Sequence, residues 1–518
     1  MTQSTSLQRA AKGSVLNVAG AGVTAVANFL LALVVARLAT EDDAGLFFSA
    51  MSLFLVAVSV CQLGTNTGLV YFISGARSRG QLASAGSYMR VAAVPVLAVS
   101  VVLAVLLFAF ANPVADVLSP DRDEQFADFI RMAALFIPFA SLLHLGLSGT
   151  RGFGTMVPYA GIDQVARPII QLGLVGLVLA IGDASDLAWA WPVAFVPLGL
   201  VGWAWWRQFS AGPFPEAPAN PSELRRPFWA FTAPRALTTV TQVAMQRLDI
   251  ILVVALADAE SAAVYFAATR FLVLGQFGAR AVSLGIQPLL GEALAQDDRS
   301  DAGAVYQAST SWLVLAAWPL YLVLAVFAET ILQVFGDSYA SEGADALRIL
   351  AITMLFATAC GLVDMVLTMG GRSMLSFTNA FVAFVAYVGI DLVLIPELGL
   401  VGAAYGWAAA ILLANVLPLF QVRATMRLHP LGSATRLAVL LAVISYGAIP
   451  LLFVAVWGRS FPTMVAALGV ATVVYVAAAV RFRSTLQIQV LLGALRSGGR
   501  RLGRSVNRRT GDEAIGDD

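Results

Sequence analysis

Five polar side chains share one face of an otherwise apolar segment that runs from Phe228 to Ala257. They are Arg235, Thr239, Gln242, Gln246 and Asp249. At about 100° per helical residue, these positions fall within roughly 80° of arc. A lipid-facing helix does not tolerate such a face, because a central Arg or Asp costs about 2.5–3.5 kcal/mol on insertion. The stripe is therefore predicted to face protein or water, and we interpret it as the lining of a polar cavity.

Further arginines lie at predicted membrane depth. Arg167 follows Asp163 by one helical turn, so the two side chains form either a self-neutralising ion pair or a cation shared with an anionic ligand. Arg247 and Arg270 join Arg235 among the candidate ligands. Arginine keeps its charge and offers a planar fork of donors, which suits a phosphate or diphosphate. The alternatives are that Arg235 extends to the membrane interface and that Arg247 and Asp249 form a structural pair with neighbouring spans.

Two acids, Asp364 and Asp391, are predicted at membrane depth in the second half of the chain. Either carboxylate is a candidate for binding a coupling H⁺ or Na⁺, or for accepting hydrogen bonds from Ser and Thr. The sequence contains no HExxH or GxxxxGK[ST] motif, and its two histidines, His144 and His429, are isolated. We therefore expect no enzymatic activity, no metal site and no bound cofactor beyond such a coupling ion.

The elements that must position these residues are membrane-spanning helices. The 518 residues are 59% hydrophobic and 12% charged, whereas soluble domains carry about a quarter charged residues. Long apolar runs recur from end to end, which predicts an all-α polytopic membrane protein with about fourteen spans. We place them at 14–37, 46–66, 88–111, 126–149, 157–181, 187–207, 228–257, 262–286, 304–327, 344–369, 374–395, 400–421, 434–456 and 461–481.

Charge assigns the loops between these spans to two sides. Acidic loops with few arginines alternate with basic ones, and the positive-inside rule places the basic ones in the cytoplasm. The basic side carries Arg9, Lys12, Arg77, Arg79, Arg151, Arg207, Arg225, Arg226, Arg299, Arg372, Arg423, Arg427, Arg436 and the tail from Arg481. Both termini are therefore predicted in the cytoplasm, with the protein in the cytoplasmic (plasma) membrane.

The chain repeats itself at an offset of 218 residues. Leu38–Phe48 aligns with Leu256–Phe266, and Trp189-Ala190 aligns with Trp407-Ala408. The stripe of the seventh span overlies a weaker one on the first span, which includes Asn17, Thr24 and the candidate ligand Asn28. Six spans per repeat is an even number, so the two repeats have parallel orientation.

This repeat divides the chain into five parts. We predict an N-terminal six-helix lobe (1–209), a cytoplasmic linker (210–226), a C-terminal six-helix lobe (227–427), two extra transmembrane helices (428–481) and a basic cytoplasmic tail (482–518). The tail carries six arginines between Arg496 and Arg509, and such a segment is attracted to anionic lipid by about 1 kcal/mol per charge. A solvated tail with no specific partner is the alternative.

The first hairpin, Val34–Leu38 through Asp43–Phe47, and the run Gln246–Leu252 with Arg270 resemble the polysaccharide-transporter branch of the multidrug/oligosaccharidyl-lipid/polysaccharide (MOP) superfamily. The resemblance implies two MATE-like lobes around a central cavity. It also implies a flippase that moves a polyprenyl-diphosphate-linked oligosaccharide, an envelope-polysaccharide precursor, by alternating access. A polymerase or glycosyltransferase would be its partner in the membrane, and nucleic acid is not expected.

Three other functions remain open. An ion-coupled drug or small-molecule antiporter of the same superfamily would favour an acid-rich cavity, whereas arginines prevail here. A membrane glycosyltransferase or ligase would need a sizeable extramembrane loop, and the predicted loops are short. A non-transporting scaffold for polysaccharide assembly is the third.

Overall fold

The computed structural model describes residues 3–212, 220–296 and 298–486. In these ranges the chain is helical and contains no strand, which confirms the predicted all-α class. Thirteen helices of the described chain are long and apolar enough to cross a membrane. The predicted span 262–286, which is not among the thirteen, lies inside the long helix α12 (Ala259–Ala295).

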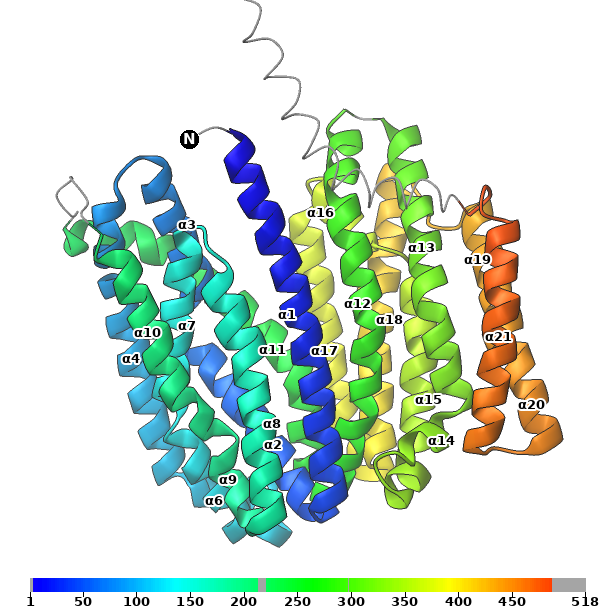
Figure 1. Cartoon of the computed structure of the whole chain (residues 1–518), viewed down its shortest axis with the longest axis horizontal. Helices are drawn as coiled ribbons and strands as arrows, with labels where there is room; N and C mark the ends of the chain where they lie inside the picture. The colour runs from blue at the N-terminus through cyan, green and yellow to red at the C-terminus, as the bar shows by residue number, and fades with distance from the viewer. Residues whose placement is uncertain (1–2, 213–219, 297, 487–518) are drawn as a thin grey trace, which may run out of the picture. The chain divides into compact units, whose positions relative to one another are not determined.

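Contacts divide the chain into two compact units, one from Thr5 to Phe266 and the other from Ala267 onward. Figure 1 labels their helices in chain order. The first unit contains α1 (Gln3–Leu38), α2 (Glu41–Cys61), α3 (Thr65–Ser78), α4 (Ala85–Ala109), α5 (Ala111–Leu118), α6 (Asp123–Ala134), α7 (Ile137–Gly152), the π-helix η3 (Tyr159–Ala166), α8 (Arg167–Ile181), α9 (Leu187–Ala190), α10 (Phe195–Ser210) and α11 (Pro221–Leu256). Short 3-10 turns occur at η1 (Leu82–Ser84), η2 (Pro120–Arg122), η4 (Ala184–Asp186) and η5 (Pro192–Ala194).

The second unit holds most of α12 and the remaining helices. These are α13 (Arg299–Val326), α14 (Ala328–Leu332), α15 (Asp337–Ala359), α16 (Val363–Met369), α17 (Ser373–Leu398), α18 (Leu400–Met426), α19 (Ser433–Ala442), the π-helix η6 (Val443–Ala448), α20 (Ile449–Trp457) and α21 (Phe461–Arg481). The last helices form a hairpin of α20 and α21 that continues from α19 (Figure 1). They pack on α13 through a cluster that includes Val314, Trp318 and Ala438.

Helix bounds confirm the two repeats. Adding 218 to both ends of α1 gives both ends of α11. The same shift carries Tyr159–Ile181 onto 377–399, which α17 covers to within one residue at its C-terminal end. Two segments with little sequence in common thus fold into the same series of helices, because span length and turn positions repeat even where side chains do not.

The first helix of the second repeat packs within the first unit. Aromatic rings join α11 to α3, where Tyr71 and Phe231 stack with ring centroids 4.1 Å apart. Phe228 is fully buried in the cluster that α3 and α4 form. α11 begins at Pro221, inside the range expected to be a linker, and the side chain of Asn220 caps it. Of the predicted basic tail, only residues up to Leu486 belong to the described chain, so its arginines and lipid contact stay a prediction.

Close helix crossings in the first unit require residues without a side chain. A Cβ on Gly45 of α2 would lie 1.7 Å from the backbone oxygen of Ala259, closer than any real contact. Next to this crossing, Phe48 and Phe266 stack at a centroid distance of 3.8 Å. The crossing therefore fixes α2 against the start of α12.

We predict that Gly45→Ala lowers the stability of the protein by about 1–3 kcal/mol, because the added methyl group forces the two backbones apart. Gly86→Ala is the matched control, since a Cβ at Gly86 in α4 meets nothing within 4 Å. The control is expected to be neutral or stabilising by about 0.5–1 kcal/mol. Thermal unfolding in detergent measures both, and equal midpoints for the two variants would contradict the crossing.

Candidate functional site

A break in regular helix geometry lies at the start of the fifth predicted span. The π-helix η3 runs directly into α8, and the backbone N–H of Arg167 donates to the carbonyl of Ile162, five residues earlier. Pro168 follows and has no N–H to donate to the carbonyl of Gln164, four residues before it. That carbonyl instead accepts the hydroxyl of Thr24 from α1 at 2.7 Å. A hydroxyl on another helix thus donates to a carbonyl that the proline four residues on cannot serve, and the same hydroxyl lies 3.1 Å from the Gly20 carbonyl of its own helix.

The side chain of Gln164 makes a second link to α1. Its Nε2 donates to Asn17 Oδ1 at 2.7 Å. A Cβ on Gly20 would meet Gln164 Oε1 at 2.4 Å, so the glutamine amide lies directly over the glycine. Asn17 and Thr24 belong to the polar stripe predicted on the first span, and the structure uses both of them to hold α1 against η3.

One turn on, Arg167 is held by its own helix. Its Nε donates to Asp163 Oδ1 at 2.8 Å, and Nη1 donates to Gln171 Oε1 at 3.1 Å. Gln171 Nε2 then donates to the carbonyl of Trp191 at 3.3 Å. The guanidinium is 5.8 Å from the centre of the Phe195 ring. Arg167 therefore has the local acid partner that one of the two interpretations required, and its role toward a ligand stays a prediction.

Arg151 lies in the last turn of α7. Its guanidinium is within 3.3 Å of the Asn66 carbonyl and 3.1 Å of the Ser148 hydroxyl, and lies 4.8 Å from the ring centre of Tyr159. Its Nε is buried and has no hydrogen-bond acceptor in the part of the chain that the structure describes. Sequence reasoning placed Arg151 in a loop and did not assign it to the site.

Arg247 on α11 is the second arginine with an unused donor. Its Nη1 is buried, and no acceptor for it occurs among the described residues. The guanidinium lies within electrostatic range of both Asp249 and Arg167. Asp249 is itself buried and accepts the backbone N–H of Ile250 at 2.9 Å. Arg247 and Arg167 thus carry like charges within electrostatic range of each other, and an anion close to both would stabilise them.

The rest of the α11 stripe is more open. Gln242 and Gln246 are exposed, and Thr239 is half-buried. Arg235 is exposed and stacks on Phe231, with the guanidinium carbon 3.5 Å from the ring centre, and Nη1 donates to the Phe231 carbonyl at 2.8 Å. Asn28 is half-buried on α1. Their assignment to a ligand stays a prediction.

Three candidate residues lie in the second unit. Arg270, on α12, is half-buried and donates to Thr269 Oγ1 at 3.3 Å. Asp364 accepts the hydroxyl of Ser376. Asp391, on α17, is fully buried, and its Oδ1 would lie 1.8 Å from a Cβ on Gly406, so the carboxylate packs directly against the α18 backbone. No group of three acids, histidines or cysteines arranged to hold a metal occurs in the described ranges.

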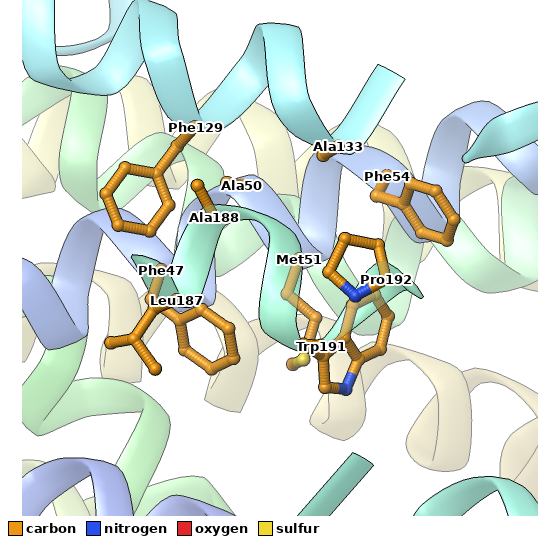
Figure 2. Close-up of a pocket in the computed structure, with 10 residues that line it drawn as sticks. All are labelled: Phe47, Ala50, Met51, Phe54, Phe129, Ala133, Leu187, Ala188, Trp191 and Pro192. Carbon is orange, nitrogen blue, oxygen red and sulfur yellow. The ribbon is translucent and has the colours of Figure 1, made fainter. Parts of the chain in front are cut away.

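A small cavity in the first unit is a packing gap. Figure 2 shows side chains of α2, α6, α9 and η5 around a cavity of about 10 Å³. Its walls are apolar, and such a space stays dry even when it is large enough for one water molecule. Trp191, whose carbonyl accepts the side chain of Gln171, is one of the residues that line it.

The candidate site of the first unit is therefore an arginine cluster. It comprises Arg151, Arg167 and Arg247 with the acids Asp163 and Asp249. The sequence named Arg167, Arg247 and Asp249 as candidate ligands and Asp163 as the neighbour of Arg167, but it did not single out Arg151, Gln164 or Gln171. The repeated i, i+4 spacing of Tyr159, Asp163, Arg167 and Gln171 was the available signal, because it places four polar side chains on one helix face.

The sequence matches the family described as "Polysaccharide biosynthesis protein" over residues 10–291, more than half of the chain, and the protein belongs to that family. Residues 234–393 also match the family described as "MatE". These matches identify the polysaccharide-transporter branch of the MOP superfamily that the first hairpin and the α11 run predicted. No curated protein matches the sequence significantly.

Solved structures with a similar fold are transporters. The chain is similar to "Lipid II flippase MurJ, inward closed conformation", with a TM-score of 0.72 and 13% identity over 91% of this chain and 99% of that one. It is also similar to an inward-facing multidrug resistance MATE family transporter of the MOP superfamily, with a TM-score of 0.60 and 17% identity over 78% of this chain and 95% of that one. A MOP superfamily transporter from Pyrococcus furiosus, whose reported pocket has reverse polarity, gives a TM-score of 0.53 and 16% identity over 82% and 96%. At these identities the likeness shows the fold alone.

We predict that Thr24→Val lowers stability by about 1 kcal/mol, because the Gln164 carbonyl loses its donor. In a Pro168→Ala background, the new backbone N–H of residue 168 can donate to the Gln164 carbonyl. Thr24→Val should therefore lower the free energy of unfolding by at least about 0.5 kcal/mol less in that background than in the wild type. A double-mutant cycle of unfolding free energies tests this coupling. Thr239→Val is the control, since that hydroxyl bonds within α11 to Arg235 O at 3.0 Å, and its effect should be the same in both backgrounds.

Proposed function

We propose that the protein is a flippase that moves a polyprenyl-diphosphate-linked oligosaccharide, an envelope-polysaccharide precursor, across the cytoplasmic membrane by alternating access through an arginine-lined cavity. The observation that carries the proposal is the arginine cluster of the first unit. Arg167 pairs with Asp163 there, and Arg247 Nη1 and Arg151 Nε are buried donors without an acceptor in the described chain. Such donors fit the oxygens of a diphosphate, which bring both the negative charge and the acceptors that the cluster lacks.

Membership in a polysaccharide-biosynthesis family and the fold shared with a lipid II flippase support this substrate class. Both termini would lie in the cytoplasm, as the distribution of arginines in the loops indicates. A polysaccharide polymerase or glycosyltransferase in the same membrane is the partner that would consume the product. Asp364 and Asp391 are the residues we propose for an H⁺- or Na⁺-coupled version of the cycle.

An ion-coupled drug antiporter of the same superfamily is the second candidate function. It is supported by the MatE match over residues 234–393 and by the buried carboxylate of Asp391. An antiporter for cationic drugs would use carboxylates as its substrate ligands. The surplus of arginine in the first unit favours an anionic substrate instead.

Reconstitution into liposomes separates the two functions. A fluorescent polyprenyl-diphosphate sugar placed in one leaflet should reach the other only in vesicles that contain the protein. A cationic dye loaded with and without an H⁺ or Na⁺ gradient is the second arm. Dye export without any movement of the lipid-linked sugar would reject the flippase in favour of the antiporter.

We expect Arg247→Gln to lower the rate of lipid-linked sugar transfer about ten-fold or more, because a charge-assisted hydrogen bond contributes about 1.5–3 kcal/mol. Arg235→Ala and Arg270→Ala should also impair transfer while leaving abundance in the membrane unchanged. Arg207→Gln is the control, since this exposed arginine in the last turn of α10 is not one of the cluster residues. Wild-type rates for all three site variants would remove the anion-binding argument.

Arg167 requires a separate test because Asp163 already pairs with it. Arg167→Gln alone leaves a buried carboxylate unpaired and should destabilise the protein. The double variant Asp163→Asn/Arg167→Gln removes both charges, so it should recover thermal stability but not transfer. Recovery of transfer in the double variant would show that the pair is only structural.

A further inference from the structure

A second cationic site lies in the other unit, at the end of the bundle where α13 begins and α18 ends. It surrounds a cavity of about 310 Å³, within the size range of small-ligand sites. Polar groups from two separate segments line it. They are Arg299, Ser300 and Gln307 from α13, and Arg427 and His429 from the segment after α18. None of these residues belongs to the arginine cluster of the first unit.

The segment after α18 is anchored so that its charged residues line the cavity. Leu428 is buried in the core cluster of α13 and α16, and a Cβ on Gly303 would lie 3.5 Å from its side chain. The Thr435 hydroxyl lies 3.0 Å from the carbonyl of Pro430, which fixes the far end of the segment. Arg427 and His429 flank the buried leucine and are both exposed. The cavity is therefore formed by the folded chain itself.

Gln307 holds the two walls together. Its Nε2 is 3.4 Å from His429 Nδ1, and its backbone carbonyl accepts the Thr435 hydroxyl at 3.3 Å. A Cβ on Gly432 would meet Gln307 Oε1 at 2.5 Å, so the glutamine side chain occupies the space over this glycine.

Arg427 has an unusual backbone for its residue type. It ends α18 in the left-handed conformation, with φ 59° and ψ 28°. Glycine commonly takes this position at a helix end because a Cβ disfavours it. In the part of the chain that the structure describes, Arg427 forms no ion pair. A strained position is thus occupied by a long cationic side chain without a carboxylate partner among the described residues, which points to a role outside folding.

The ends of α13 and α18 are expected to place the cavity at the level of the membrane surface. α13 and α18 are both membrane-spanning helices, and the loop charges predict that this end faces the cytoplasm. Leu431, two residues after His429, is 53% exposed. An exposed leucine beside exposed arginines matches the boundary between acyl chains and headgroups.

We propose that this cavity binds the phosphate of an anionic phospholipid headgroup in the cytoplasmic leaflet. Arg299 and Arg427 would donate to the phosphate oxygens, His429 and Gln307 would hydrogen-bond the headgroup, and Leu431 would contact the acyl chains. The apolar contact and the interfacial position favour a lipid over a free phosphate. The proposal does not depend on which substrate the protein transports.

Native mass spectrometry of the full chain in detergent, titrated with phosphatidylglycerol, tests the site without measuring transport. The double variant Arg299→Gln/Arg427→Gln should bind the first phosphatidylglycerol about ten-fold more weakly than the wild type, because two charge-assisted contacts are lost. The matched control is Arg423→Gln/Arg436→Gln. It removes the same charge from two exposed arginines close to the cavity that do not line it.

Two further measurements distinguish the source of the phosphate and the role of Arg427. Glycerophosphoglycerol and pyrophosphate, which lack acyl chains, should bind at least ten-fold more weakly than the lipid. Arg427→Gly should raise the unfolding temperature yet weaken lipid binding, which excludes misfolding as the cause. Any of three results would overturn the proposal. The first is that the Arg299→Gln/Arg427→Gln variant binds the lipid as tightly as the wild type, and the second is that the control variant loses as much affinity. The third is that the chain-free anions bind as tightly as the lipid.

Discussion

The structure depends on the inability of hydrocarbon to satisfy polar groups. Every backbone N–H and C=O at membrane depth needs a partner in the protein, and each departure from regular helix must be compensated locally. The junction of η3 and α8 illustrates this constraint. Pro168 removes one donor, the chain widens into a π-helix, and the Thr24 hydroxyl takes over the released carbonyl of Gln164. The polar stripe of α1 is thereby joined to the helix that carries Arg167.

The two repeats share helix lengths but not chemistry. Shifted by 218 residues, Asp163, Gln164, Arg167 and Gln171 correspond to Phe381, Val382, Val385 and Gly389. In place of that cluster, the second repeat has a reciprocal pair of amide hydrogen bonds between Asn379 and Gln421, at 2.7 and 2.9 Å. An uncharged pair is self-sufficient, whereas the arginine cluster keeps donors without acceptors in the described chain. The first repeat therefore carries charged and polar side chains at positions where the second repeat is apolar. The anion site is proposed in the first unit because of this difference.

Similar folds in this superfamily serve different substrates, so the distinction between flippase and antiporter depends on side chains. The lipid II flippase and the MATE transporters share the architecture of this protein at identities of 13–17%. Arginine at membrane depth is costly, and a cluster of such residues persists only where something compensates its charge. Asp163 compensates one of the three guanidinium groups by direct contact, and a diphosphate is the ligand we propose for the others.

The sequence by itself determined the class of fold, the number of spans to within one, the repeat and the α11 stripe. These are local or periodic properties, set by hydropathy over about twenty residues and by recurring turn signals. Only the tertiary structure decided which polar groups are already satisfied. Thr24 and Gln164 are 140 residues apart in the chain, and the role of Arg151 depends on Asn66, 85 residues before it. A hydrogen-bond partner is defined by three-dimensional proximity, and spacing along one chain carries no information about contacts between distant segments.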